Sequence, residues 1–183
     1  MSSVNILDPI WASYSTTVDC LKVASRSVAK GELHLMSNTK FVGSAIDEAK
    51  TMIKDSRMSA DDFVIVSLWA VFERKLTEYV QAEGRRLLQT VPTNFNTQVH
   101  KKVENEMEYW KTDDILDLFK AVVSADLIGN AKQVKKYRDW IAHKNPKKGP
   151  PSNVPPLTAY RILSDIILAV EQHPELKQAA TTA

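Results

Sequence analysis

Apolar residues recur along most of this chain with the three-to-four-residue spacing of an α-helix. The stripe from Val42 to Ile53, for example, follows the i, i+3, i+4, i+7 pattern that lines one helix face. We find no coherent segment with the two-residue alternation of a strand. The pattern predicts an all-α chain with helices over 8–30, from about 39, and over 60–90, 95–110, 112–123, 124–143 and 157–172.

Helix starts are expected where a capping side chain precedes an apolar run. Ser59 followed by Asp62 is such an arrangement, and it predicts the start of a new, long helix. By the same reasoning, caps are expected at Asn38 or Thr39 and at Thr112. The apolar stripe of the long helix continues unbroken beyond FVIVSLWAVF, which predicts a central helix contacted from several sides.

Turn-forming residues divide the chain. Residues 146–156 hold five of its eight prolines, which predicts a stiff, irregular loop. We therefore expect an N-terminal helical extension over 1–38 and a helical domain over 39–173. The tail, residues 174–183, is expected to be disordered.

Composition narrows the class of protein. The chain has 183 residues, of which 44% are hydrophobic and 25% charged, as in a globular domain. Only five glycines are present, too few for the many tight turns of a β-sandwich or barrel. Cys20 is the single cysteine, so we expect no intramolecular disulfide and a cytoplasmic location. No signal peptide or bilayer-spanning run is recognised, so no membrane association is expected.

Charge is concentrated in one segment. The net charge is only +2, but residues 132–148 hold seven Lys or Arg against one acid, Asp139. Such a segment can contact phosphates, or it can be a solvated helix end followed by a solvated loop. Charge alone leaves both interpretations open.

Arg138 and His143 stand out within this segment. At about 100° per residue, Arg138 lies about 40° from Val134, inside the apolar stripe of its helix. A charge in that place indicates either a structural salt bridge or a guanidinium held ready for a phosphate. His143 lies about 140° from Arg138, so the two meet only if the helix end unwinds or a second subunit contributes. Asp139 stands one helical turn before His143 and could orient the imidazole.

The order Arg138, Asp139, three residues and His143 resembles the signature of the HEPN superfamily: Arg, four to six residues and His, often with a polar residue directly after Arg. The surroundings are similar as well. Residues 127–171 resemble the motif helix, irregular loop and closing helix of that family, and LWAVFERKLTEYV resembles one of its earlier helices. The resemblance covers residues 39–172.

The resemblance implies a HEPN-like bundle of about five to six helices that forms a homodimer. It also implies a metal-independent endoribonuclease without cofactors, as in toxins of toxin–antitoxin or antiviral systems, with RNA and an antitoxin protein as partners. Arg138 would bind the scissile phosphate, His143 would act on the ribose 2′-hydroxyl or the leaving oxygen, and Asp139 would orient the pair.

Further residues are assigned more remotely. The cations expected to track the RNA backbone are Lys135, Lys136, Lys144, Lys147 and Lys148. Secondary candidates are Glu73 and Arg74, for which a structural ion pair is the simpler role, and Trp140, which could stack on a base or pack in a dimer interface.

Two alternatives remain open. One is a catalytically inactive HEPN module that binds RNA, a nucleotide or a protein. The other is a helical interaction protein in which Arg138 pairs with a buried acid.

Overall fold

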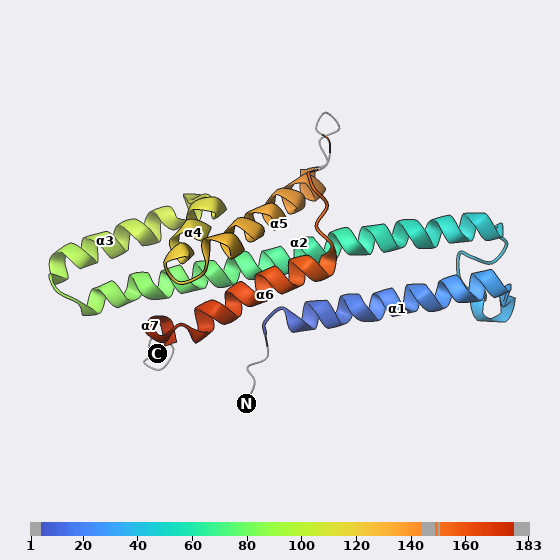
Figure 1. Cartoon of the computed structure of the whole chain (residues 1–183), viewed down its shortest axis with the longest axis horizontal. Helices are drawn as coiled ribbons and strands as arrows, with labels where there is room; N and C mark the ends of the chain where they lie inside the picture. Colours follow the sequence, from blue (N-terminus) through green and yellow to red (C-terminus); the bar gives the residue numbers. More distant parts are fainter. Residues whose placement is uncertain (1–4, 144–148, 150, 178–183) are drawn as a thin grey trace.

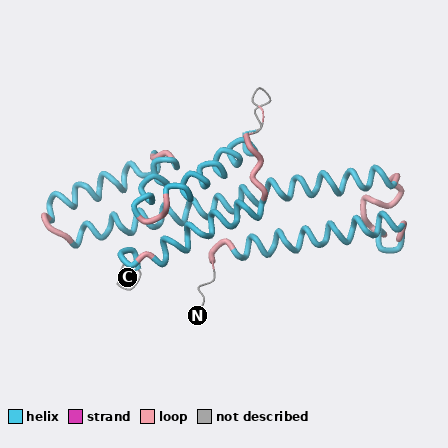
Figure 2. The backbone as a smooth tube through the Cα atoms, viewed as in Figure 1, coloured by secondary structure: helices cyan, strands magenta, loops and turns pink. Residues whose placement is uncertain are grey.

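The computed structural model describes residues 5–143, 149 and 151–177, and every regular element in this part of the chain is helical (Figure 2). The all-α prediction is therefore confirmed. None of the helices described is long and apolar enough to cross a membrane. The α-helices are α1 (Asp8–Lys30), α2 (Ile46–Arg86), α3 (Thr93–Glu106), α4 (Thr112–Leu118), α5 (Ala125–His143), α6 (Pro156–Gln172) and the short α7 (Pro174–Lys177).

Helix α2 is the axis of the molecule. Its 41 residues extend over about 60 Å at 1.5 Å per residue. In Figure 1, α1 lies along the first half of α2 and α3 along the second half, while α4, α5 and α6 cover its middle. The chain thus forms a helical bundle at one end and a two-helix arm, made of α1 and the start of α2, at the other.

The continuity of α2 corrects the prediction that Ser59 begins a separate helix. Ser59 is an exposed position inside α2, which starts at Ile46 without a side-chain cap. No glycine or proline interrupts the helix before Ser59, and Ile53 and Val64, three turns apart, lie within about 20° of one face. The apolar contact with neighbouring helices therefore continues through the serine, and neither Asn38 nor Thr39 begins the helix.

The predicted cap at Thr112 is also wrong. Helix α4 begins one residue earlier than a cap at this position requires, with Lys111 at the N-cap and no side-chain cap. The Thr112 hydroxyl instead donates a hydrogen bond to the side chain of Glu73 on α2. The Thr112 hydroxyl therefore bonds to a residue on another helix instead of capping its own helix.

The main core lies where the middle of α2 meets α5 and α6. Trp69 and Phe72 of α2 are completely buried there. Their buried neighbours on the other helices are Leu116, Ile128, Val134, Leu163, Ile166 and Ile167. Such a core fixes the faces that α2, α5 and α6 turn inward, and it thereby fixes which polar residues lie at its edge.

Helix α1 is joined to both ends of the molecule. At its start, Leu7 lies in the main core, Trp11 stacks on Tyr160 of α6 at 4.8 Å, and Tyr160 donates a 2.6 Å hydrogen bond to Asp8. At its other end, a second small core joins α1 to the arm portion of α2 through Val28, Met36, Ala49 and Ile53.

The continuity of α2 can be tested with two proline substitutions. Ala60→Pro should lower the free energy of unfolding by about 3 kcal/mol or more, because proline inside a helix loses a hydrogen bond and clashes with the preceding turn. Ile46→Pro should change it by less than about 1 kcal/mol, because the first turn of a helix accepts proline and Ala45 is already extended. Urea denaturation of both variants measures the difference. Equal tolerance of the two would restore a helix start at Ser59.

Candidate functional site

Helix α5 carries the motif residues and is anchored by its apolar face. Its first turn is capped by the Ser124 hydroxyl, which accepts a hydrogen bond from the Leu127 amide at 3.3 Å. Val134 is completely buried and Ile141 nearly so, which confirms Val134 as a residue of the buried stripe. Arg138 lies between them in sequence and on the same face, so its side chain starts from the core edge.

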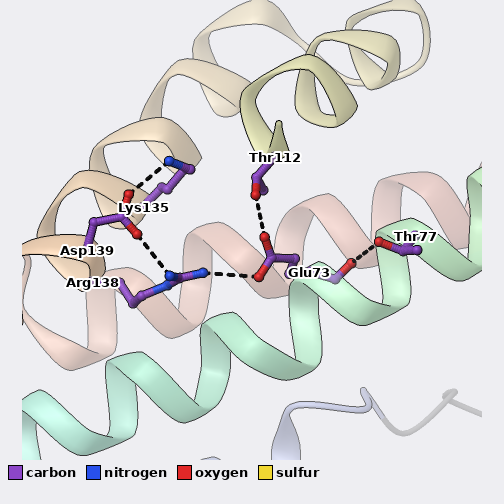
Figure 3. Close-up of polar contacts among 6 residues, drawn as sticks. All are labelled: Glu73, Thr77, Thr112, Lys135, Arg138 and Asp139. Carbon is purple, nitrogen blue, oxygen red and sulfur yellow. Dashed lines mark hydrogen bonds and ion pairs between the residues drawn. The ribbon is translucent and has the colours of Figure 1, made fainter. Parts of the chain in front are cut away.

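The guanidinium of Arg138 is held from two sides (Figure 3). Its Nη2 donates to Oε2 of Glu73 on α2 at 3.0 Å, and its Nη1 lies 2.9 Å from Oδ1 of Asp139. It also lies over the ring of Trp69, 5.5 Å from the centroid. The Arg138 side chain is 23% exposed, so the charge is fixed at the core edge and still reaches solvent.

Glu73 joins three helices. Its Oε2 accepts from Arg138 on α5, and its Oε1 accepts from the Thr112 hydroxyl on α4. The Thr77 hydroxyl donates to the main-chain carbonyl of Glu73 and not to its carboxylate, at 3.0 Å. Glu73 is thus the point at which α2, α4 and α5 are held together by polar contacts.

Asp139 is occupied by cations. Its Oδ2 accepts from Lys135 at 2.9 Å, while its Oδ1 faces Arg138. Among the described residues, no hydrogen bond or ion pair joins Asp139 to His143. The structure therefore brings Asp139 to Arg138 and Lys135, and the role expected for it toward the imidazole stays a prediction. We call Glu73, Thr112, Lys135, Arg138 and Asp139 the Arg138 cluster.

His143 is the last residue of α5 and its side chain is exposed. One turn earlier, Trp140 stacks on Tyr137 with ring centroids 6.0 Å apart. The Tyr137 hydroxyl donates to Asp62 of α2 at 3.4 Å, and burial together with that carboxylate raises the pKa of the tyrosine. The Trp140 ring is therefore packed against another side chain of its own helix.

The basic segment is partly neutralised. Lys135 is paired with Asp139, whereas Lys136 is exposed and has no partner among the described residues. Lys132 contacts Asp117 at 2.7 Å, and Lys120 and Lys132 together hold the pKa of that carboxyl below its usual value. Lys144, Lys147 and Lys148 lie outside the described residues.

Of the two secondary candidates on α2, only Glu73 belongs to the site. Arg74 is exposed and lies 3.7 Å from Glu78 on its own helix. The sequence did not identify Thr112 as a neighbour of Glu73 or Trp69 as a neighbour of Arg138. Trp69 does stand one turn before Glu73 on the same helix. That spacing was the available signal for the tryptophan.

Comparisons with protein-family models, with curated proteins and with solved structures found no match to this chain. The HEPN resemblance therefore depends on the motif and its helical setting. Among the described residues, no group of three or more His, Cys, Asp or Glu side chains is placed to hold a metal ion.

The contact between Glu73 and Arg138 can be measured with a double-mutant cycle. Glu73→Ala and Arg138→Ala should each lower the free energy of unfolding by about 1–3 kcal/mol, because each leaves a partly buried charge without its partner. The double variant should lose about 1 kcal/mol less than the sum of the two single losses. This coupling is modest because both side chains are partly exposed.

Lys136→Ala is the matched control, since it removes an exposed cation from the same helix. It should change stability by less than about 0.5 kcal/mol. Strictly additive effects of the Glu73 and Arg138 substitutions would show that the pair contributes nothing beyond its separate residues.

Proposed function

We propose that the C-terminal end of α5 is an RNA-cleaving site of the HEPN type, with Arg138 as the phosphate-binding group and His143 as the proton-transfer group. The observation that carries the proposal is that Arg138 is fixed at the core edge and still partly exposed, on the same helix as the exposed His143. A fixed guanidinium and a free imidazole are the two groups that cleavage by an internal hydroxyl requires.

In this reaction the ribose 2′-oxygen attacks the adjacent phosphorus while the bond from phosphorus to the 5′-oxygen breaks. A neutral imidazole accepts the proton of the 2′-hydroxyl, and the leaving 5′-oxygen gains a proton from a general acid. The guanidinium balances the charge that develops on the phosphate oxygens. The products are a 2′,3′-cyclic phosphate and a 5′-hydroxyl, and no metal ion enters the scheme.

A homodimer completes the site in this proposal. His143 lies five positions after Arg138, so one helix presents them about 140° apart. Two copies of α5 paired about a two-fold axis would let each cleft use Arg138 from one subunit and His143 from the other. The imidazolium formed when His143 takes the proton of the 2′-hydroxyl would then serve as the general acid for the leaving 5′-oxygen.

A specific observation favours a second candidate function. Arg138 is paired with two carboxylates, as expected for a helical interaction protein in which the motif arginine is structural. The charges of Lys135, Arg138, Glu73 and Asp139 cancel, so the cluster offers little attraction to a free phosphate. A module that binds a protein partner without cleaving RNA would need no more than this arrangement.

The activity test compares wild-type protein with His143→Ala on a mixed RNA pool in the presence of a chelator. We expect the wild type to cleave and to leave cyclic phosphate ends, and we expect the variant to lose cleavage. The free energy of unfolding should change by less than about 1 kcal/mol, because an exposed residue at a helix end contributes little packing. RNA carrying 2′-O-methyl groups should resist, because it lacks the attacking hydroxyl.

Sedimentation of the same samples should show a dimer at micromolar concentration. Equal cleavage by both proteins would identify a contaminant or another site and would remove His143 from the proposal. A folded wild-type protein without cleavage would favour the structural alternative.

A further inference from the structure

We infer that Glu73 is a positioning residue for Arg138, and that Thr112 in turn fixes Glu73. The inference builds on the proposed function, because the arginine it positions is the proposed phosphate-binding group. The observation behind it is the chain of contacts from α4 through α2 to α5, in which each carboxylate oxygen of Glu73 has its own donor (Figure 3).

Glu73 gives Arg138 an anchor on another helix. Asp139 is the next residue on α5, so it moves with Arg138 and cannot set its place relative to the rest of the fold. Glu73 belongs to α2, the helix against which the others pack, and it accepts a 3.0 Å hydrogen bond from Nη2 of Arg138. The ring of Trp69 restricts the guanidinium on one side.

The contacts with Glu73 and Asp139 leave N–H groups of Arg138 available for a ligand. A guanidinium has five N–H groups, and one of them donates a hydrogen bond to Glu73, while Asp139 forms an ion pair with the same guanidinium. No other described residue accepts a hydrogen bond from Arg138, so N–H groups remain for a phosphate. The two carboxylates therefore orient the guanidinium without exhausting it.

Glu73 also has a cost for binding, because its negative charge weakens the attraction between Arg138 and a phosphate. Removing the charge should thus have two opposite effects. Substrate should bind at least as tightly, while the loosened guanidinium should stabilise the transition state less well. A residue with only a structural role does not separate KM from kcat in this way.

The experiment uses Glu73→Gln, which keeps the shape of the side chain and removes its charge. Two threonines provide matched variants. Thr112→Val removes the hydroxyl that contacts the Glu73 carboxylate, and Thr77→Val removes one that contacts only its main-chain carbonyl. The first readout is the ¹⁵N NMR signal set of the Arg138 guanidinium, identified by its absence in Arg138→Lys. The second is kcat and KM for RNA cleavage.

We expect slow rotation of the guanidinium in the wild type and in Thr77→Val, and averaged signals in Glu73→Gln and Thr112→Val. In Glu73→Gln, kcat should fall at least tenfold while KM stays level or falls. Signals and kcat within twofold of wild type in folded Glu73→Gln would overturn the inference. If that variant fails to fold, wild-type behaviour of Thr112→Val would overturn it equally.

The two readouts separate the two proposals. A wild-type protein that cleaves no RNA contradicts the proposed function, and the NMR signals then decide alone whether Glu73 fixes Arg138. Active protein with unchanged signals in both variants contradicts the positioning role and leaves the proposed function intact.

Discussion

A helix of 41 residues has to be covered along its whole length, and this constraint arranges the rest of the chain. Helices in water owe most of their stability to the packing of an apolar face. Helix α2 is apolar on several sides near Trp69 and Phe72, where both rings are completely buried, and α4, α5 and α6 gather there. Toward the start of α2, where the apolar stripe is narrow, α1 packs against that stripe.

The same constraint explains the polar cluster. Glu73 directly follows Phe72 and so lies where several helices converge on α2. A carboxylate at that place loses much of its hydration and needs positive or hydrogen-bonding partners. Arg138 and Thr112 meet this need from two helices, and partial exposure keeps the desolvation cost moderate. The contact also favours one register of α5 against α2, because sliding α5 by one turn would separate Arg138 from Glu73.

The sequence carried much of the fold and part of the site. The helical stripes, the burial of Val134 and the need of Arg138 for a partner all follow from periodicity, because a helix turns by a fixed angle per residue. The identity of that partner does not. Glu73 is 65 positions away from Arg138, and no spacing rule relates residues on different helices. Two opposite charges on two apolar stripes are a hint of pairing, but several acids on α2 compete for the role.

The local errors have a common physical origin. Ser59 and Thr112 are good capping residues. A capping residue is recognised in a sequence by the hydrogen bonds that its side chain can form with the nearby main chain. Inside α2, the apolar face continues through Ser59, so the serine does not cap a new helix. At α4, the Thr112 hydroxyl bonds to the carboxylate of Glu73 instead of capping its own helix. Tertiary contacts decide between such options, and sequence patterns do not display them.

The charge balance of the Arg138 cluster limits how a phosphate could be recognised there. Two cations and two carboxylates within a few ångströms cancel at distances beyond the Debye length of about 8 Å, so the cluster attracts no polyanion from afar. Attraction would have to come from cations outside it, such as the exposed Lys136. The cluster would then act only at contact, where the free N–H groups of Arg138 meet individual oxygens. Recognition at such a site depends on geometry more than on charge, and geometry is what Glu73 and α2 supply.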